Sequence, residues 1–312
     1  MRAGDGGDAA ESGYRSGRYA LALAHLGTPL QLSRSGGWLL RRPIGDSGFE
    51  DARGPYPILV CRDWSQVRAD LESLPSTLAS VTLVADPLGE WTAEGLKAAF
   101  PDVARPFKTH YMTDLREDLG RITARHHQRA ARRALRHVSV EVCASPAEAR
   151  ADWIRLYGNL VVRHGIVGLA AFPEDSLSKQ LDVPGLMLVR VRRGEATVGL
   201  VLWYLDGSVA RYHLAAYSPE GYDIGASHAA FWFSLSELQR LGLTWAHLGG
   251  SAGLAMTQDG LDRFKRGWAS GTCTAWLCGR ILRQDIYEQL TARAGGASRG
   301  YFPAYRTPDG NP

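Results

Sequence analysis

The fold of this chain is decided by one stretch, residues 212–227, which reads YHLAAYSPEGYDIGAS. Its first six residues have the composition of a strand, glycines at 221 and 225 mark a turn, and a long apolar helix is expected over 226–241. Such a turn presents backbone N–H groups and the positive end of a helix dipole, which suit an anion or a polarised carbonyl. Gly225 and Ser227 are therefore candidate donor-binding residues, although similar turns are common where nothing binds.

The elements around this stretch alternate between helices and strands. The sequence predicts helices at 146–164 and 173–181, strands at 186–192, 196–205 and 209–217, the helix at 226–241, a strand at 244–248, a short helix at 260–265, a strand at 272–277 and a helix at 283–293. Before residue 146 it predicts helices at 14–26, 64–73 and 91–100 and strands at 30–33, 38–43, 57–61, 81–85, 108–115 and 138–143.

This order predicts an α+β fold of two similar halves, with mixed, mostly antiparallel sheets flanked by helices. We expect a flexible N-terminus over 1–13 and a first lobe over 14–145, which includes a basic helix at 115–137. A second lobe is expected over 146–294, followed by a tail over 295–312.

The composition excludes several classes of protein. Hydrophobic residues make up 45% of the 312 residues and charged residues 22%, which is unlike a disordered, collagen-like or coiled-coil chain. No apolar run approaches the ~18 residues of a membrane span, and residues 1–13 do not resemble a signal peptide. Four scattered cysteines predict a cytoplasmic protein without a disulfide framework, and no metal site is expected.

The positive charge is concentrated in one segment. The net charge is 36 − 32 = +4, yet residues 119–140 contain six arginines and no acidic residue. At ~100° per residue, Arg125, Arg129, Arg132 and Arg136 fall on one helical face. Stacked arginines repel one another, so this face predicts either a phosphate-rich partner or carboxylates supplied from elsewhere in the fold.

A second candidate site lies near the end of the chain, at Phe264-Lys265. The chain has only four lysines against 36 − 4 = 32 arginines, so a lysine carries more information than usual. An ammonium can stabilise a developing oxyanion. The alternative is a surface lysine paired with Asp259 or Asp262.

Three residues of the 209–217 strand could also take part in chemistry. Tyr212 and His213 are candidate catalytic residues, and Tyr217 is a candidate donor-binding residue. Regular alternation would put His213 and Tyr217 on one face and Tyr212 on the other. Packing in the core is the alternative for each, and no hydrolase triad, zinc motif or P-loop is present.

With its segments assembled, the chain resembles the Fem-type branch of the GNAT-like acyltransferases, the peptidoglycan-bridge aminoacyltransferases and their relatives. The segments that carry the resemblance are Tyr19, WLLRRPI at 38–44, GPYP at 54–57, HQRAARRALR at 127–136 with VSV at 138–140, Leu156-Tyr157 with Arg163-His164, the stretch from Gly199 to Ser227, HLGG at 247–250 and RFKR at 263–266. Their order and spacing together cover nearly the whole chain.

The resemblance implies two GNAT-like lobes and direct transfer of an aminoacyl group from aminoacyl-tRNA to an amine. Carried over by position, Phe264 holds the acceptor end of the tRNA and Lys265 stabilises charge at the reacting carbonyl. The substrate can assist proton transfer in the Fem reaction, so no protein base is required. The acceptor is a cell-wall precursor, a peptide or a small natural product, and no bound cofactor is implied.

The chain departs from the family pattern in two ways. The long helical hairpin inserted in some members is absent. The phosphate loop of acetyl-CoA enzymes, Arg/Gln-x-x-Gly-x-Gly/Ala, appears only as YDIGAS at 222–227, without its cationic or amide first residue and with Asp223 close to where pyrophosphate would lie. Acyl-CoA-dependent transfer and a non-catalytic nucleic-acid or anion-binding module therefore remain as alternatives.

Overall fold

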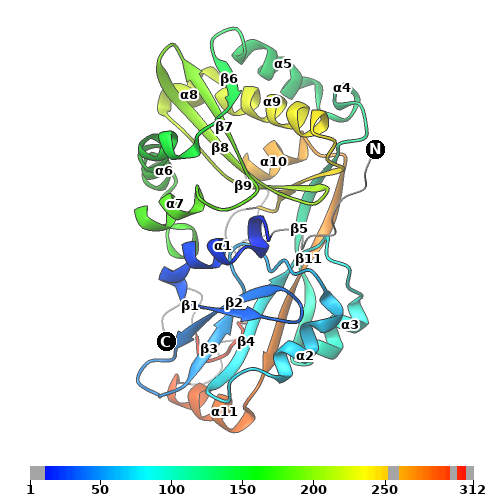
Figure 1. Ribbon diagram of the computed structural model, residues 1–312, viewed down its shortest axis with the longest axis vertical. Coiled ribbons are helices and arrows are strands. Elements are labelled where there is room, and N and C mark those ends of the chain that lie inside the picture. The colour runs from blue at the N-terminus through cyan, green and yellow to red at the C-terminus, as the bar shows by residue number, and fades with distance from the viewer. Residues whose placement is uncertain (1–10, 252–259, 296–300, 307–312) are drawn as a thin grey trace, which may run out of the picture.

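The computed structural model describes residues 11–251, 260–295 and 301–306 (Figure 1). Its strands form one sheet of eleven, mostly antiparallel, in the order β1-β2-β3-β4-β11-β5-β10-β9-β8-β7-β6. They are β1 (Thr28–Leu32), β2 (Gly37–Pro43), β3 (Glu50–Arg53), β4 (Leu78–Ala85), β5 (Val103–Asp114), β6 (Ser139–Val142), β7 (Leu186–Arg193), β8 (Ala196–Asp206), β9 (Val209–Tyr217), β10 (Trp245–Gly249) and β11 (Gly271–Ile281).

Helices flank this sheet in both halves of the molecule (Figure 1). They are α1 (Gly17–Ala22), α2 (Val67–Glu72), α3 (Ala93–Ala99), α4 (Leu119–Ile122), α5 (Arg125–Ala134), α6 (Arg150–His164), α7 (Glu174–Gln180), α8 (Pro219–Ile224), α9 (Ala226–Arg240), α10 (Gly260–Arg266) and α11 (Gln284–Arg293). Within the described residues, no helix is long and apolar enough to cross a membrane, and no two helices form a projecting hairpin.

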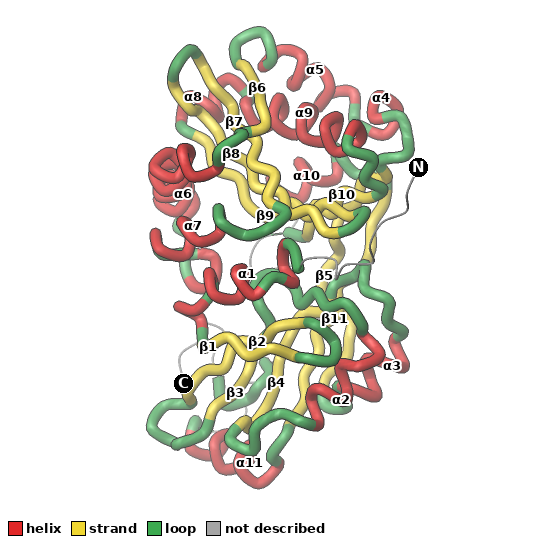
Figure 2. The backbone as a smooth tube through the Cα atoms, in the orientation of Figure 1, coloured by secondary structure: helices red, strands yellow, loops and turns green. Residues whose placement is uncertain are grey.

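Two long strands join the halves into one sheet. β5 pairs with β10 through residues 111–114 and with β11 over almost its whole length. β11 in turn pairs with β4, so the sheet runs without a break from one end of the molecule to the other (Figure 2). The mixed, mostly antiparallel arrangement expected from the sequence is thus present as one continuous sheet that both halves share.

Segments from each half of the sequence lie in the opposite half of the structure. The basic helix α5 packs against α9, and β6 pairs with β7. Conversely, α11 from the second half of the sequence packs against β4 of the first half. There Ile286 and Leu290 form an apolar cluster with Ile44 and Tyr305. The 301–306 part of the expected tail is thus anchored, and Arg306 Nε donates to Asp51.

A buried aromatic cluster fills the junction between the halves. Tyr14 and Tyr19 from the start of the chain pack against Trp153 and Tyr204 from the second half. Separate apolar clusters fill each half, around Trp203 in one and around Phe100 in the other. The N-terminal segment is therefore ordered from Gly13, which begins a 3-10 turn, while residues 1–10 lie outside the described part.

The structure corrects several predicted elements. The basic helix expected at 115–137 is two helices, because Thr123 and Ala124 are extended between α4 and α5. Residues 57–61 form only an isolated bridge from Leu59 to Ala85 and no strand, whereas the short, charged β3 was not predicted. The turn after β9 contains a helix, α8, whose start is capped by Ser218.

Candidate active site

β9 and β10 are parallel neighbours that pair over only three residues each, 209–211 with 245–247. Beyond this point β9 continues to Tyr217 with β8 as its strand partner among the described residues. The register with β8 shifts here, since Leu202 lies opposite Leu214 and Trp203 opposite Tyr212, which makes His213 an extra, bulged residue. We call the place where β9 and β10 part the fork.

Lys265 lies at the fork. Its side chain, on α10, is 5% exposed, and its Nζ donates to the carbonyl oxygen of Gly250 at 2.6 Å. Gly249 has a φ of 72°, and a Cβ there would stand 3.4 Å from Nζ. The end of β10 thus holds an ammonium close to its backbone, and Lys265 is not the surface lysine of the alternative interpretation. Asp262 pairs with Arg266, and Asp259, the other partner named in that interpretation, lies outside the described residues.

Tyr212 is the residue of β9 that meets Lys265. The ammonium lies 5.5 Å from the centre of the Tyr212 ring, which also packs against Trp203 and Phe231. Burial, followed by the neighbouring phenols of Tyr222 and Tyr56, raises the pKa of Tyr212. It is therefore a neutral phenol at physiological pH, which can donate a hydrogen bond but is a poor base.

His213 faces away from the fork. Its Nε2 lies 2.9 Å from Gln180 Oε1, an acceptor only, so Nε2 carries the proton. Its Nδ1 then accepts from the Tyr14 hydroxyl at 3.0 Å. Burial lowers the pKa of His213 to about 3. Both ring nitrogens are engaged in the junction between the halves.

The bulge also places Tyr217 differently from the predicted alternation. Tyr217 lies with Tyr212 in the cluster around Trp203, whereas His213 contacts the junction cluster. The expected sharing of a face by His213 and Tyr217 is wrong, because the extra residue reverses the alternation. Tyr217 is buried against Gly199, and its hydroxyl has no hydrogen-bond partner among the described residues.

Phe264 connects the fork to the basic helix. Its ring packs on Phe231 at 4.8 Å, on His228 at 5.2 Å and on His127 of α5 at 5.5 Å between centroids. Phe264 is half-buried in this cluster, so one side of the ring is already occupied. Lys265 follows it on the same short helix.

The turn before α9 lies against the basic helix as well. Gly225 has a φ of 74° and caps α9, and a Cβ there would lie 4.0 Å from the Ala134 side chain. Ser227 occupies the first turn of α9 and is half-buried. Because α8 fills the turn, Ser218 already accepts the N–H of Gly221, and fewer backbone donors remain than the sequence suggests.

The arginines of α5 form a cationic surface. An open depression of about 740 Å³ is lined by His126, Arg129, Ala130, Arg132, Arg133 and Arg136. Arg125 lies outside it, although its carbonyl accepts from Arg129 Nε. In the described part of the chain no carboxylate pairs with any α5 arginine, so the expected alternative of carboxylates from elsewhere in the fold is not found there. We call this depression the arginine surface.

A histidine pair beside Lys265 was not predicted. His110 Nδ1 and His247 Nε2 lie 2.9 Å apart, and both rings are buried. Burial, with Arg211 and Lys265 nearby, lowers the pKa of His247 to about 3; burial, His247 and Lys265 lower that of His110. The two residues are 137 apart in sequence, which no local pattern connects.

Comparisons with known proteins bear on the fold of the chain. Residues 120–266 match the family model described as an acetyltransferase (GNAT) domain, and no curated protein matches the sequence. The crystal structure of FemX superposes with a TM-score of 0.64 at 14% identity, covering 88% of this chain and 93% of FemX. The C-terminal domain of a protein described as a lysylphosphatidylglycerol synthetase, from Agrobacterium fabrum, gives 0.59 at 14% identity, covering 92% and 96%.

Residues 120–266 are therefore similar to a GNAT acetyltransferase domain. Nearly the whole chain shares its fold with FemX and with the synthetase domain, as the resemblance found in the sequence implies.

Proposed function

We propose that the protein transfers an aminoacyl group from aminoacyl-tRNA directly to an amine. The observation that carries this proposal is the arginine surface, whose cations lack carboxylate partners in the described residues. The same helix, α5, contacts Phe264 of α10 through His127. Arginines without carboxylate partners can bind phosphates. The neighbour of Phe264 at the fork is the one buried lysine of the chain.

The reaction needs no protein nucleophile. The amine nitrogen attacks the ester carbonyl carbon, the C–N bond forms, and the ester C–O bond breaks. The proton lost by the amine goes to the departing ribose hydroxyl, so atoms and charges balance. Lys265 would stabilise the oxyanion of the intermediate, and the Tyr212 phenol would help to orient the carbonyl. Phe264 would pack the donor end, and the backbone around Gly225 would position it.

The second candidate donor is an acyl-CoA. The match of residues 120–266 to an acetyltransferase model favours it. The same amine would then attack a thioester, and the arginine surface would take the phosphates of the coenzyme. Asp223 in the turn before α9 is unfavourable for a pyrophosphate at that place.

The donor is identified by incubating the protein with charged tRNA or acetyl-CoA and a set of amines, followed by mass spectrometry. We expect an aminoacylated product that disappears after RNase treatment of the donor. An acetylated product that is insensitive to RNase would support the acyl-CoA alternative. The proposed acceptors are a cell-wall precursor, a peptide or a small natural product, in the cytoplasm where both donors are available.

A further inference from the structure

Asp51 on β3 accepts hydrogen bonds from two arginines. Arg42 Nε donates to its Oδ1 at 2.9 Å, and Arg306 Nε donates to its Oδ2 at 2.6 Å. Each guanidinium also reaches the second oxygen through Nη2 at 3.2 Å. The side chains of Asp51 and Arg306 are only 1% and 4% exposed. One buried negative charge therefore faces two positive charges.

A third arginine lies on the same face of β3. Arg53 follows Asp51 by two residues, so both side chains leave the strand on one face. In the register with β2, Arg53 lies opposite Leu40, which is two residues before Arg42. Arg53 Nε donates to the carbonyl oxygen of Gly54 at 3.3 Å, and no carboxylate pairs with Arg53 in the described part of the chain. The β3 cluster consists of Arg42, Asp51, Arg53 and Arg306.

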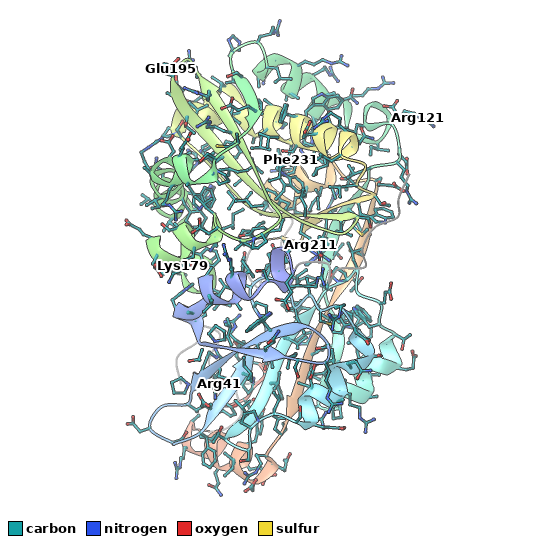
Figure 3. All side chains as sticks on the ribbon, in the orientation of Figure 1. Arg41, Arg121, Lys179, Glu195, Arg211 and Phe231 are labelled. Carbon is teal, nitrogen blue, oxygen red and sulfur yellow. The ribbon has the colours of Figure 1, made fainter. Side chains whose placement is uncertain are left out.

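The β3 cluster carries an excess of positive charge, because its three guanidinium groups have one carboxylate among them. The neighbouring Arg41 is labelled in the lower half of Figure 3 and marks this part of the sheet. Arg41 pairs with Glu50 at 3.4 Å, and this pair leaves the balance of the cluster unchanged.

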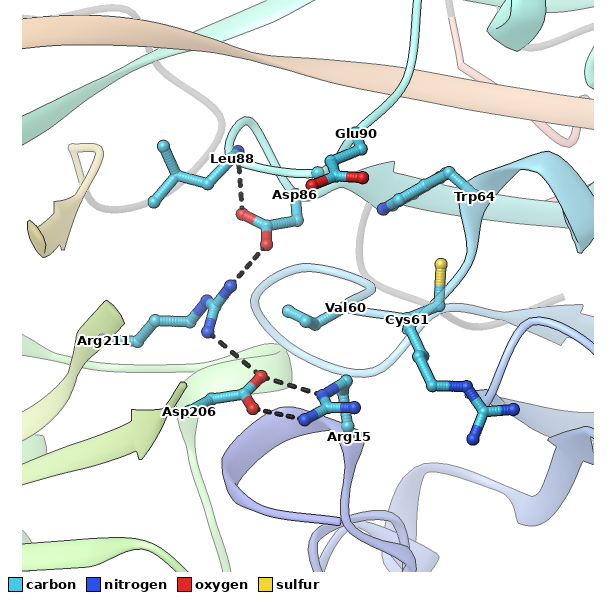
Figure 4. Close-up of a pocket in the computed structure, with 11 residues that line it drawn as sticks. Arg15, Val60, Cys61, Trp64, Asp86, Leu88, Glu90, Asp206 and Arg211 are labelled. Atoms are coloured by element: carbon cyan, nitrogen blue, oxygen red, sulfur yellow. Dashed lines mark hydrogen bonds and ion pairs between the residues drawn. The ribbon is translucent and has the colours of Figure 1, made fainter. Parts of the chain in front are cut away.

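Two arginines at the junction of the halves show the opposite situation. Arg211 pairs with Asp86, and Arg15 pairs with Asp206, beside a cavity of about 220 Å³ (Figure 4). Two guanidinium groups there face two carboxylates, so their charges balance. The β3 cluster lacks such a second carboxylate among the described residues.

The unbalanced charge is unfavourable where Arg53 lies. Burial, followed by the like charge of Arg42, lowers the pKa of Arg53 to about 10. The side chain is therefore still charged at neutral pH, and the protein does not remove the free-energy cost by releasing the proton. A bound anion would supply the missing negative charge.

The end of the Arg53 side chain is open to a ligand. Arg53 is only partly buried. Arg41 Nε is closed to solvent and has no partner among the described residues, whereas neither Nη1 nor Nη2 of Arg53 is closed off in this way. The two terminal N–H groups of a guanidinium match two oxygens of a carboxylate or a phosphate.

We propose that Arg53 binds an oxyanion, a phosphate or a carboxylate group, which completes the charge balance of the β3 cluster. Because Arg306 belongs to the segment 301–306, the added negative charge also stabilises the contact between this segment and β3. The site contains neither Lys265 of the fork nor an arginine of α5, so it is separate from the proposed transfer site and does not depend on the proposed function.

The test compares the wild type with Arg53→Met, which keeps an unbranched side chain and removes the charge. Thermal unfolding and calorimetry are carried out with inorganic phosphate or acetate, at constant ionic strength maintained with chloride. We expect saturable millimolar binding and a rise in Tm with at least one of the two probes. In Arg53→Met the affinity should fall about tenfold or more, since charge-assisted hydrogen bonds are lost. The better probe distinguishes a phosphate ligand from a carboxylate ligand.

The stability of Arg53→Met without either probe gives a second, independent result. We expect it to unfold at or above the temperature of the wild type, because an uncompensated charge has been removed. Arg105→Met is the matched control, since Arg105 is an exposed arginine of β5 that also has no carboxylate partner in the described residues, and its binding should equal that of the wild type.

Three results would overturn the proposal. One is equal binding of the probes by the wild type and by Arg53→Met, and another is stabilisation by chloride alone to the same extent. The third is a marked loss of stability of Arg53→Met without probes, which would show that the charge is already compensated within the protein.

Discussion

Lys265 is the only one of the four lysines with a buried side chain. Lys265 lies at the end of β10 and beside Tyr212, and under the proposed function its ammonium would face the negative charge that develops on the substrate carbonyl. This is the arrangement expected of a group that stabilises an oxyanion.

We predict that Lys265→Ala lowers kcat by about 10²–10³-fold while the protein stays folded. The control is Lys179→Ala, which removes a half-exposed lysine paired with Asp175. Turnover is measured with whichever donor proves active, and circular dichroism checks the fold. Wild-type turnover in Lys265→Ala would remove this residue from the mechanism.

The buried histidines predict a loss of stability in acid. The pKa of His213 is lowered to about 3 by burial, against about 6.5 in an unfolded chain. Between these values the unfolded state binds more protons, so the free energy of unfolding is unaffected above about pH 6.5 and falls as the pH drops towards 3. The limiting slope is about 1.4 kcal/mol per pH unit for each such histidine.

We therefore expect His213→Gln to unfold more easily at pH 7 but to lose less stability between pH 6.5 and 5 than the wild type. Urea unfolding at both pH values measures this, with the exposed His137→Gln as control. A variant with an unchanged pH dependence would contradict the assignment of a neutral, buried His213.

At the scale of residues, the sequence named Lys265 and Tyr212 as catalytic candidates, and the fold brings the Lys265 ammonium to 5.5 Å from the centre of the Tyr212 ring. It could not predict the orientation of His213, because a bulge depends on the register of two strands and leaves no local pattern. The His110–His247 pair was missed for a similar reason, since it depends on adjacent strands that are distant in sequence.

Among the elements, α5 concentrates several arginines on one helix, and none of them pairs with a carboxylate among the described residues. Some arginines of other helices are paired, as Arg68 is with Glu72 on α2 and Arg240 with Glu237 on α9. Since like charges on one helix face repel, the surface is retained at a small cost in stability.

We predict that replacing Arg129 and Arg132 with alanine weakens binding of the phosphate-bearing donor and lowers its salt dependence. For two lost phosphate contacts on single-stranded RNA, the slope of log K against log salt falls by roughly 1.4. Stability should be unchanged or slightly higher. The matched control is Arg68→Ala with Arg240→Ala. Equal salt slopes in the two double variants would contradict the role of the arginine surface.

Most elements were predictable because their periodicity and turn residues are local. The meander β7–β8–β9 is separated by Gly194 and Gly207, both at positive φ, as expected of tight turns. β3 and α8 were missed because they are short, and β3 has two acidic residues among its four. The break in the basic helix was missed because Thr123 and Ala124 are not strong helix breakers.

At the scale of the whole molecule, the ion pair between Arg211 and Asp86 links the two halves. Both side chains are almost fully buried, at 6% and 2% exposure. Removing one partner of such a pair leaves a buried charge without its counter-ion. The free-energy cost of that charge exceeds the net stabilisation that the intact pair provides.

We expect Asp86→Ala to lower the free energy of unfolding by about 3–5 kcal/mol. Replacing both Asp86 and Arg211 with uncharged residues should recover part of this loss, because no lone charge then remains. Chemical denaturation of the single and double variants measures both effects. A single variant as stable as the wild type would show that the pair does not hold the halves together.

The two-lobed α+β architecture was predictable, but the continuity of the sheet was not. β11 pairs with both β4 and β5, which are far from it in the chain. No local sequence pattern indicates in which half of the molecule a strand will find its partners.

Because β11 comes from the second half of the sequence and pairs with β4 and β5 of the first, the chain cannot be cut between its halves without removing strand partners. A fragment ending at Ser145 would lack the strand that covers β4 and β5, and would also lack the helix and the strands on which α5 and β6 rest. Neither piece would have a complete hydrophobic interior. We therefore expect the chain to fold as one cooperative unit and neither fragment to fold by itself.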